Sequence, residues 1–182
     1  CDQAARQLLG KRSSSVFPVP PRLALASLSY EEINRASKAH CGKGVSKQAF
    51  YLLPKIREAE ALLRLSSPHA LDWLETHPEL CFSGLNDGVP MEENKKTEAG
   101  YRERRRTLAR YIPVRTVDRL LRHLMTSVPR ARCARDDMMA ALVCGVVARF
   151  DAPGRDCLPQ GEHEFDELGL PMRICQPLSD TP

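Results

Sequence analysis

Residues 116–128 read TVDRLLRHLMTSV, and this stretch decides the fold class. Side chains three and four positions apart share one face of an α-helix, and the apolar side chains of this stretch follow that spacing. Thr116 is expected to cap the helix and Pro129 to follow its end. The stretch therefore predicts an amphipathic helix, whose apolar stripe consists of Val117, Leu120, Leu121, Leu124, Met125 and Val128.

Helical patterns also precede this stretch. Ser29 with Glu32 predicts a capped helix over residues 30–40 that ends at Gly42 and Gly44. Ser46 predicts the cap of the next helix, with a kink or a fresh start at Pro54. A short helix is expected over residues 67–77, closed by Pro78, then a loop over residues 84–94 and a basic helix over residues 97–111.

Downstream, Asp136 is expected to cap a strongly apolar helix that ends near Phe150 and forms the centre of the core. Alternating strand patterns are almost absent, with residues 172–175 the one candidate. The predicted class is all-α: an irregular bundle of five to seven short helices. The side chains expected to be buried together are Val117, Leu121, Leu124, Leu142, Val146 and Phe150.

Three segments divide the chain. Residues 1–29 are basic and rich in proline, so we expect an extended segment; residues 30–150 form the helical domain, and residues 151–182 an irregular acidic tail. Because the first residue is Cys1 and not methionine, we expect a processed chain or a fragment of a longer one. The serine- and arginine-rich, acid-poor start is typical of a mitochondrial import leader, or else of an ordinary basic linker.

Composition excludes several classes. The chain has 182 residues, of which 42% are hydrophobic and 27% charged, so it is neither collagen-like, nor a coiled coil, nor wholly disordered. The longest apolar run, residues 140–147, is too short to span a membrane.

The seven cysteines are odd in number and widely scattered, which predicts free thiols in an intracellular, reducing compartment. No pair has zinc-site spacing, so we expect no metal and no cofactor. If zinc were bound, the candidate ligands would be His40, Cys41, Cys157 and His163. We expect no catalytic residues, although a cysteine-dependent enzyme is a third hypothesis.

The charge distribution is the strongest functional signal. Residues 101–135 contain eleven arginines, no lysine and two acids, a net charge of +9, whereas the whole chain carries +4. Arginine is favoured where planar contacts with phosphate or carboxylate are needed. The candidate polyanion-binding residues are Arg102, Arg105, Arg106, Arg110, Arg115, Arg119 and Arg122.

Structured RNA, contacted through its backbone, is the expected partner, together with neighbouring proteins; no membrane and no small-molecule substrate is expected. The first hypothesis is thus a non-catalytic structural subunit of a ribonucleoprotein assembly such as an organellar ribosome. The alternative is a protein-interaction or helix-turn-helix-like DNA-binding domain of a larger regulator, suggested by residues 29–33 and 44–51. Pairing of the arginines with the acidic tail would remove the need for a polyanion.

Overall fold

A computed structural model describes residues 1–26, 29–65, 73–129, 131–150, 154–162 and 164–178. Helices dominate these residues, and the two strands form one small antiparallel sheet, so the all-α prediction is confirmed. The α-helices are α1 (Asp2–Leu9), α2 (Tyr30–Cys41), α3 (Lys47–Leu65), α4 (Pro78–Leu85), α5 (Glu98–Leu108), α6 (Val114–Ser127) and α7 (Arg135–Val147). Two 3-10 helices, η1 (Gly10–Ser15) and η2 (Arg22–Leu25), and the strands β1 (Arg155–Leu158) and β2 (Ile174–Pro177) complete the described elements.

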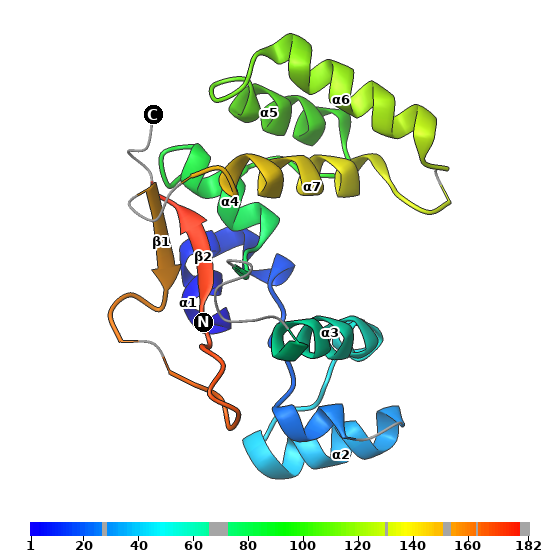
Figure 1. Cartoon of the computed structure of the whole chain (residues 1–182), viewed down its shortest axis with the longest axis vertical. Helices are drawn as coiled ribbons and strands as arrows, with labels where there is room; N and C mark the ends of the chain where they lie inside the picture. The colour runs from blue at the N-terminus through cyan, green and yellow to red at the C-terminus, as the bar shows by residue number, and fades with distance from the viewer. Residues whose placement is uncertain (27–28, 66–72, 130, 151–153, 163, 179–182) are drawn as a thin grey trace.

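Helices α5, α6 and α7 lie together at one end of the molecule, and α2 and α3 lie at the other (Figure 1). Helix α4, α1 and the sheet lie between these ends. The largest apolar cluster joins α4, α5, α6 and α7. The expected core is largely confirmed, because Val117, Leu121 and Val146 are buried in that cluster and three partly buried side chains pack against it: Leu124, Leu142 and Phe150.

Helix α4 is one of the elements that the sequence pattern missed. Pro78 stands at its first position, and the His77 ring accepts a hydrogen bond from the Glu79 N–H at 3.2 Å. The prediction that Pro78 closes a helix was therefore wrong, whereas the loop expected over residues 84–94 is present but begins after Leu85. Residues 67–72 of the helix expected over residues 67–77 lie outside the described part, and residues 73–77 are not helical. Every residue from Glu79 to Leu85 is buried, so α4 has no polar face and no helical period to recognise.

The first two predicted caps are confirmed. Ser29 accepts a hydrogen bond from the Glu32 N–H at 3.2 Å, and Gly42 ends α2 with a left-handed φ of 72°. Ser46 accepts one from the Ala49 N–H at 3.1 Å. Helix α3 then runs through Pro54 without interruption, so the alternative of a fresh helix start there was wrong.

Two other predicted caps were wrong. Helix α6 begins at Val114, directly after Pro113, so Thr116 lies inside its first turn. Helix α7 begins at Arg135, and it is Asp137 whose carboxylate accepts a hydrogen bond from the Ala134 N–H, at 3.1 Å. Asp136 instead forms an ion pair with Lys95 at 3.4 Å.

The expectation of an extended start was wrong for residues 2–15, which form α1 and η1. Ala5 and Leu9 are completely buried, in an apolar cluster with Leu80 of α4 and with side chains of both strands. The arginine- and serine-rich composition did not indicate this helix, which buries only Ala5 and Leu9 and leaves Leu8 47% exposed.

Residues 155–158 form strand β1, which the sequence pattern missed, and they pair with β2 in an antiparallel register. Cys157 and Cys175 face each other in this pair and form a disulfide. The expectation of free thiols was therefore wrong for these two residues. Such bonds persist mainly in oxidising compartments, so this finding weighs against the predicted reducing compartment, which stays a prediction. The free cysteines are Cys1, Cys41, Cys81, Cys133 and Cys144.

Candidate nucleic-acid interface

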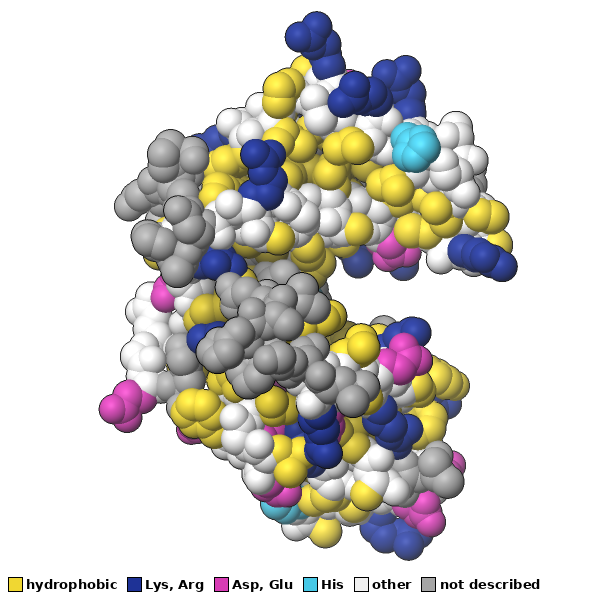
Figure 2. Space-filling model, viewed as in Figure 1, with side chains coloured by type: hydrophobic (Ala, Val, Ile, Leu, Met, Phe, Trp, Pro, Cys, Tyr) yellow, Lys and Arg dark blue, Asp and Glu magenta, His cyan; other side chains and the backbone are white. Residues whose placement is uncertain are grey.

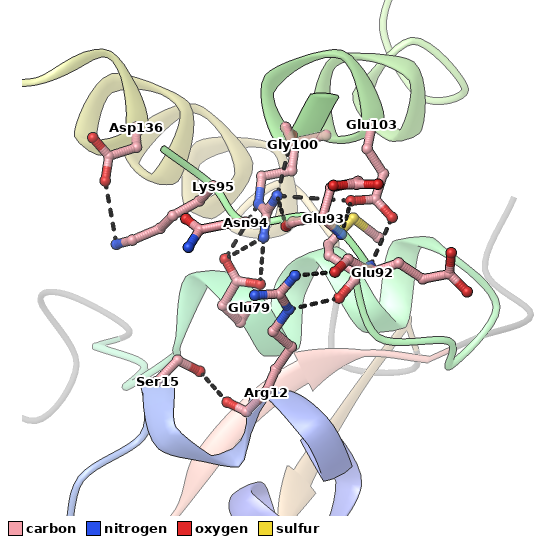
Figure 3. Close-up of polar contacts among 12 residues, drawn as sticks. Arg12, Ser15, Glu79, Glu92, Glu93, Asn94, Lys95, Gly100, Glu103 and Asp136 are labelled. Atoms are coloured by element: carbon pink, nitrogen blue, oxygen red, sulfur yellow. Dashed lines mark hydrogen bonds and ion pairs between the residues drawn. The ribbon is translucent and has the colours of Figure 1, made fainter. Parts of the chain in front are cut away.

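Helix α5 begins against a tightly fitted loop. Thr97 caps it by accepting a hydrogen bond from the Gly100 N–H at 3.0 Å. The Glu103 carboxylate accepts hydrogen bonds from the N–H groups of Glu92 and Glu93 at 2.8 and 3.0 Å, which holds the loop on the helix (Figure 3). Residue 100 must be glycine here, because a Cβ atom would lie only 2.0 Å from the Asn94 carbonyl oxygen.

Arg104 belongs to the basic window and is nevertheless buried, with only 3% of its side chain exposed. Its guanidinium donates hydrogen bonds to both oxygens of Glu79 on α4, the shortest at 2.8 Å. It also donates to the carbonyl oxygens of Glu93 and Gly100, each at 3.1 Å (Figure 3). Arg104 therefore fixes α5 to the core and cannot reach a partner.

Arg105 joins α5 to α6. It donates two hydrogen bonds of 2.6 Å to the two oxygens of Asp118. This contact holds the pKa of the Asp118 carboxyl below its usual value and raises the pKa of the arginine. The orientation of α6 on α5 is set by this pair together with the buried Val117 and Leu121.

Two further predicted site residues also have acidic partners. Arg110 forms two hydrogen bonds with Asp87, at 2.9 and 3.0 Å, and lowers the pKa of that carboxyl. Arg102 lies 3.3 Å from Glu98, one helical turn before it. Because Glu98 is also 2.9 Å from Arg135, this carboxylate serves two arginines.

Of the remaining four predicted site residues, three have no carboxylate partner in the described part of the chain, and the fourth, Arg122, lies near the Asp118 carboxylate, whose pKa it helps to lower. Arg106, Arg115 and Arg119 are exposed, and among the described residues none of them has an ion pair or side-chain hydrogen bond. The exposed Arg122 donates one hydrogen bond of 3.3 Å to the Asp118 backbone carbonyl. We call these four residues the outer arginine patch. Figure 2 shows Lys and Arg side chains at the α6 end of the molecule, beside exposed apolar side chains.

The helical spacing explains why the patch is continuous on α6. Arg115, Arg119 and Arg122 stand at i, i+4 and i+7, so they share one face of the helix. That face points away from Val117 and Leu121, which are 0% and 2% exposed. Within the described residues, the structure thus divides the seven predicted residues into the four of the outer arginine patch, of which Arg122 alone interacts with a carboxylate, that of Asp118, and three that form ion pairs within this chain: Arg102, Arg105 and Arg110.

The acidic tail does not neutralise the basic window in the described part of the chain. Asp166 pairs instead with Arg22 of η2, and Asp156 accepts hydrogen bonds from Cys157 N–H and Gln160. Glu162, Glu164 and Glu167 are exposed. Self-pairing between tail and window, the alternative to an external polyanion, therefore finds no contact among these residues.

A pocket of about 370 Å³ opens between α5 and α6, beside the patch. The sequence pattern predicted no pocket here. Val117, Leu121 and Leu124 of the apolar stripe were expected to be buried, and no position was predicted for Leu120 and Met125; these two are substantially exposed, at 37% and 39%. The apolar stripe of α6 is wider than the surface that one neighbouring helix can cover, and this width indicates that some of its apolar side chains stay exposed. The lining residues are Tyr101, Asp118, Leu121, Arg122 and Met125.

The free cysteines form no pair with a histidine base. The exposed Cys41 thiol has a lowered pKa because it contacts the Ser37 hydroxyl, and no histidine or carboxylate contacts it among the described residues. The buried Cys81 has a raised pKa, because it contacts Cys144 and lies away from solvent.

The candidate zinc ligands are not brought together either. Cys157 is in the disulfide, and His163 lies outside the described residues. Across the described ranges, no three His, Cys, Asp or Glu side chains group in a way that could hold a metal ion. Of the helices in those ranges, none has the length and apolar character to cross a membrane.

Fold and surface define a small helical protein with one basic, partly apolar exposed face. The chain belongs to the family described as "Protein of unknown function (DUF429)", whose model matches residues 1–164. The match includes all of α5 and α6 and therefore the outer arginine patch. No curated protein and no solved structure matches the chain.

Proposed function

We propose that this protein is a non-catalytic structural subunit of a ribonucleoprotein assembly, and that it binds the phosphate backbone of structured RNA through the outer arginine patch. The observation that carries the proposal is the absence of carboxylate partners around Arg106, Arg115 and Arg119 in the described structure. Arginines that are already paired would have to release a carboxylate before binding phosphate, whereas these three would not. Arg122 lies near the Asp118 carboxylate, which Arg105 already binds.

The energetics favour phosphate over the weak acidic contacts nearby. Exposed ion pairs contribute only about 0–1 kcal/mol each. Phosphate binding also releases condensed counterions, which adds affinity at low salt. Backbone contact needs charge and shape rather than base readout, and an A-form helix offers phosphates across its accessible minor groove. The Arg105–Asp118 contact, which fixes α6 on α5, supports the proposal because it holds the patch in one arrangement.

The test is binding of the isolated chain to a fully paired RNA hairpin across a salt series. Each neutralised phosphate contributes roughly 0.7–0.9 to the slope of log affinity against log salt. Replacing Arg106, Arg115 and Arg119 together by alanine should lower that slope by about 2–3. The matched control replaces Arg35, Lys38 and Lys47 of α2 and α3 by alanine, which removes the same charge from exposed positions at the other end of the molecule.

The control also decides between the proposal and the helix-turn-helix alternative. An unchanged slope in the patch variant, with a reduced slope in the α2–α3 variant, would overturn the proposal and place the binding surface on α3. No binding to RNA or DNA at low salt would leave an acidic protein surface as the partner of the patch.

Membership of an assembly is tested separately. The native protein should migrate at megadalton size in size-exclusion chromatography of cell extract, and RNase treatment should release it. A free monomer in untreated extract would contradict the proposed role as a subunit. The mitochondrial location inferred from the basic start of the chain stays a prediction.

A further inference from the structure

The pocket between α5 and α6 shares Arg122 with the outer arginine patch. We propose that this pocket receives one unpaired nucleobase of the RNA whose backbone the patch contacts. The inference rests on the proposed function and deepens it, because it names the RNA feature that the surface would select: a bulged or looped-out nucleotide within a structured element.

The pocket is lined by both apolar and charged side chains. Tyr101, Met125 and Leu121, the last of them 2% exposed, supply the apolar part of the lining, and we call the two charged lining residues, Asp118 and Arg122, the rim. The Tyr101 ring is held in place because the Arg135 guanidinium lies over it, 4.2 Å from the ring centroid. A fixed aromatic ring and a thioether together form a surface on which the face of a base can pack.

The rim offers both hydrogen-bonding polarities. The Asp118 carboxylate accepts, and it is held in position by Arg105. The Arg122 guanidinium donates and uses only one donor within the chain, toward the Asp118 backbone carbonyl. The edge of a nucleobase carries amino groups for such a carboxylate and ring nitrogens or carbonyls for such a guanidinium. An apolar side chain of a protein partner would leave both rim groups unused.

Size and charge restrict the occupant further. The volume of about 370 Å³ lies near the lower end of the roughly 300–1,000 Å³ range of small-ligand pockets, which suits a single ring system. The flanking patch carries three arginines, Arg106, Arg115 and Arg119, that have no acidic partner among the described residues, which favours an occupant that belongs to an anionic molecule. Bases inside a duplex are stacked and paired, and therefore only an unpaired base can enter.

The experiment compares three RNA hairpins of the same stem sequence: fully paired, with one unpaired nucleotide in the stem, and with an abasic site in place of that nucleotide. The hairpin with the unpaired base should bind about tenfold more tightly than the other two, since one stacked base contributes an effect of that order. The salt slopes of the three should agree, because the phosphate contacts are the same.

Two substitutions locate the effect. Met125→Ala and Tyr101→Leu should each reduce the preference for the unpaired base while leaving binding of the paired hairpin unchanged. Leu120→Ala is the matched control, because Leu120 is an apolar residue of the same helix with a similar exposure, 37% against 39% for Met125, and does not line the pocket. It should retain the full preference. Circular dichroism and thermal unfolding verify that Tyr101→Leu folds; Met125→Ala tests the pocket independently.

The outcomes separate the two proposals. Equal affinity for all three hairpins, with the salt slope still dependent on the patch, would overturn the base pocket and leave the backbone-binding function standing. A preference that survives both Met125→Ala and Tyr101→Leu would place base recognition elsewhere and also overturn the pocket. Failure of every hairpin to bind would overturn both.

Discussion

Helices α5 and α6 are neighbours of similar basic composition, yet they use arginine in opposite ways. On α5, Arg104 is buried against Glu79, and Arg105 is fastened to Asp118. On α6, Arg115 and Arg119 are exposed and have no partner among the described residues. The arginines of α5 mainly hold the fold together, whereas those of α6 are available to a ligand.

This difference arises from what surrounds each helix. Helix α5 packs between α4, α6, α7 and the loop at residues 92–94. Of these, α4, α6 and the loop bring carboxylates or carbonyls within reach of its arginines. Helix α6 lies at the outer edge of the molecule and contacts neighbours on one side only (Figure 1). A run of arginines in a sequence is thus one charge pattern that serves two physical roles, and the packing decides which residue has which role.

The largest effect that separates the two roles is expected at Arg104. Replacing it by methionine leaves the buried Glu79 carboxylate without its partner, which should lower the free energy of unfolding by about 3–5 kcal/mol. Arg106→Met, an exposed change two positions further along α5, should stay within about 0.5 kcal/mol. Urea unfolding of both variants measures the contrast. The double variant Arg104→Met, Glu79→Leu should recover much of the loss; equal small losses in both single variants would contradict the division of roles.

The second prediction compares the two faces of α6. Leu121 is buried at 2% exposure, so Leu121→Ala should cost about 2–5 kcal/mol through the cavity it leaves. The adjacent Leu120 is 37% exposed, and Leu120→Ala should cost less than about 1 kcal/mol. Thermal or urea unfolding gives both values. Similar costs at the two positions would mean that α6 packs by a different face.

Helical periodicity made α2, α3, α5, α6 and α7 predictable, because apolar residues recur three and four positions apart in each of them, with polar residues between. It missed α4, whose residues Glu79–Leu85 are all buried, and β1, a four-residue strand whose partner follows it by almost twenty positions. The N-terminal caps of α2 and α3 were predictable because a serine precedes each helix. The start of α6 at Val114 was not, because Pro113 precedes it and makes no side-chain hydrogen bond.

The candidate interface was predictable as a region and not as individual residues. The basic window located the arginine-rich segment, which the structure folds into α5 and α6, because charge is a property of the sequence itself. It could not show which arginines are neutralised, since Glu79 and Asp87 reach them from α4 and its following turn, more than twenty residues away. The same limit applies to the pocket, which exists only because Tyr101 of α5 meets Met125 of α6.

The third prediction concerns the close packing of the first turn of α5 against the loop that precedes it. In Gly100→Ala, the new Cβ atom would lie 2.0 Å from the Asn94 carbonyl oxygen, so the loop backbone must shift. Overpacking of this kind should lower stability by about 1–3 kcal/mol. The control is Gly145→Ala on α7, where a Cβ atom meets nothing within 4 Å; that change should raise stability by about 0.5–1 kcal/mol. A loss at Gly145 as large as that at Gly100 would show that the close approach to Asn94 is not the cause.

A smaller effect should follow when a paired arginine of α5 is released. Asp118→Asn frees Arg105, and the slope of log affinity for the fully paired hairpin against log salt should steepen by roughly 0.7–0.9, the contribution of one added phosphate contact. Asp87→Asn removes the same charge and frees Arg110, which points toward α4 and donates to the Leu85 carbonyl. Its slope should stay unchanged. Equal steepening in both variants would show that net charge, rather than the position of Arg105, controls binding.

The smallest effect is the pH dependence of the Arg105–Asp118 pair. Arg105 lowers the pKa of the Asp118 carboxyl in the folded state, so the pair stabilises the fold above the unfolded value of about 3.9. This contribution is lost as the pH falls through the lower, folded-state pKa, because protonation removes the charge that the guanidinium binds. Carboxyl-detected NMR titration should give Asp118 a midpoint below that of an ordinary aspartate, and Arg105→Gln should return it to the ordinary range. Asp87 should keep its own lowered midpoint in that variant, since its partner is Arg110. A midpoint for Asp118 that does not move in Arg105→Gln would mean that another group, and not the contact between α5 and α6, stabilises its charge.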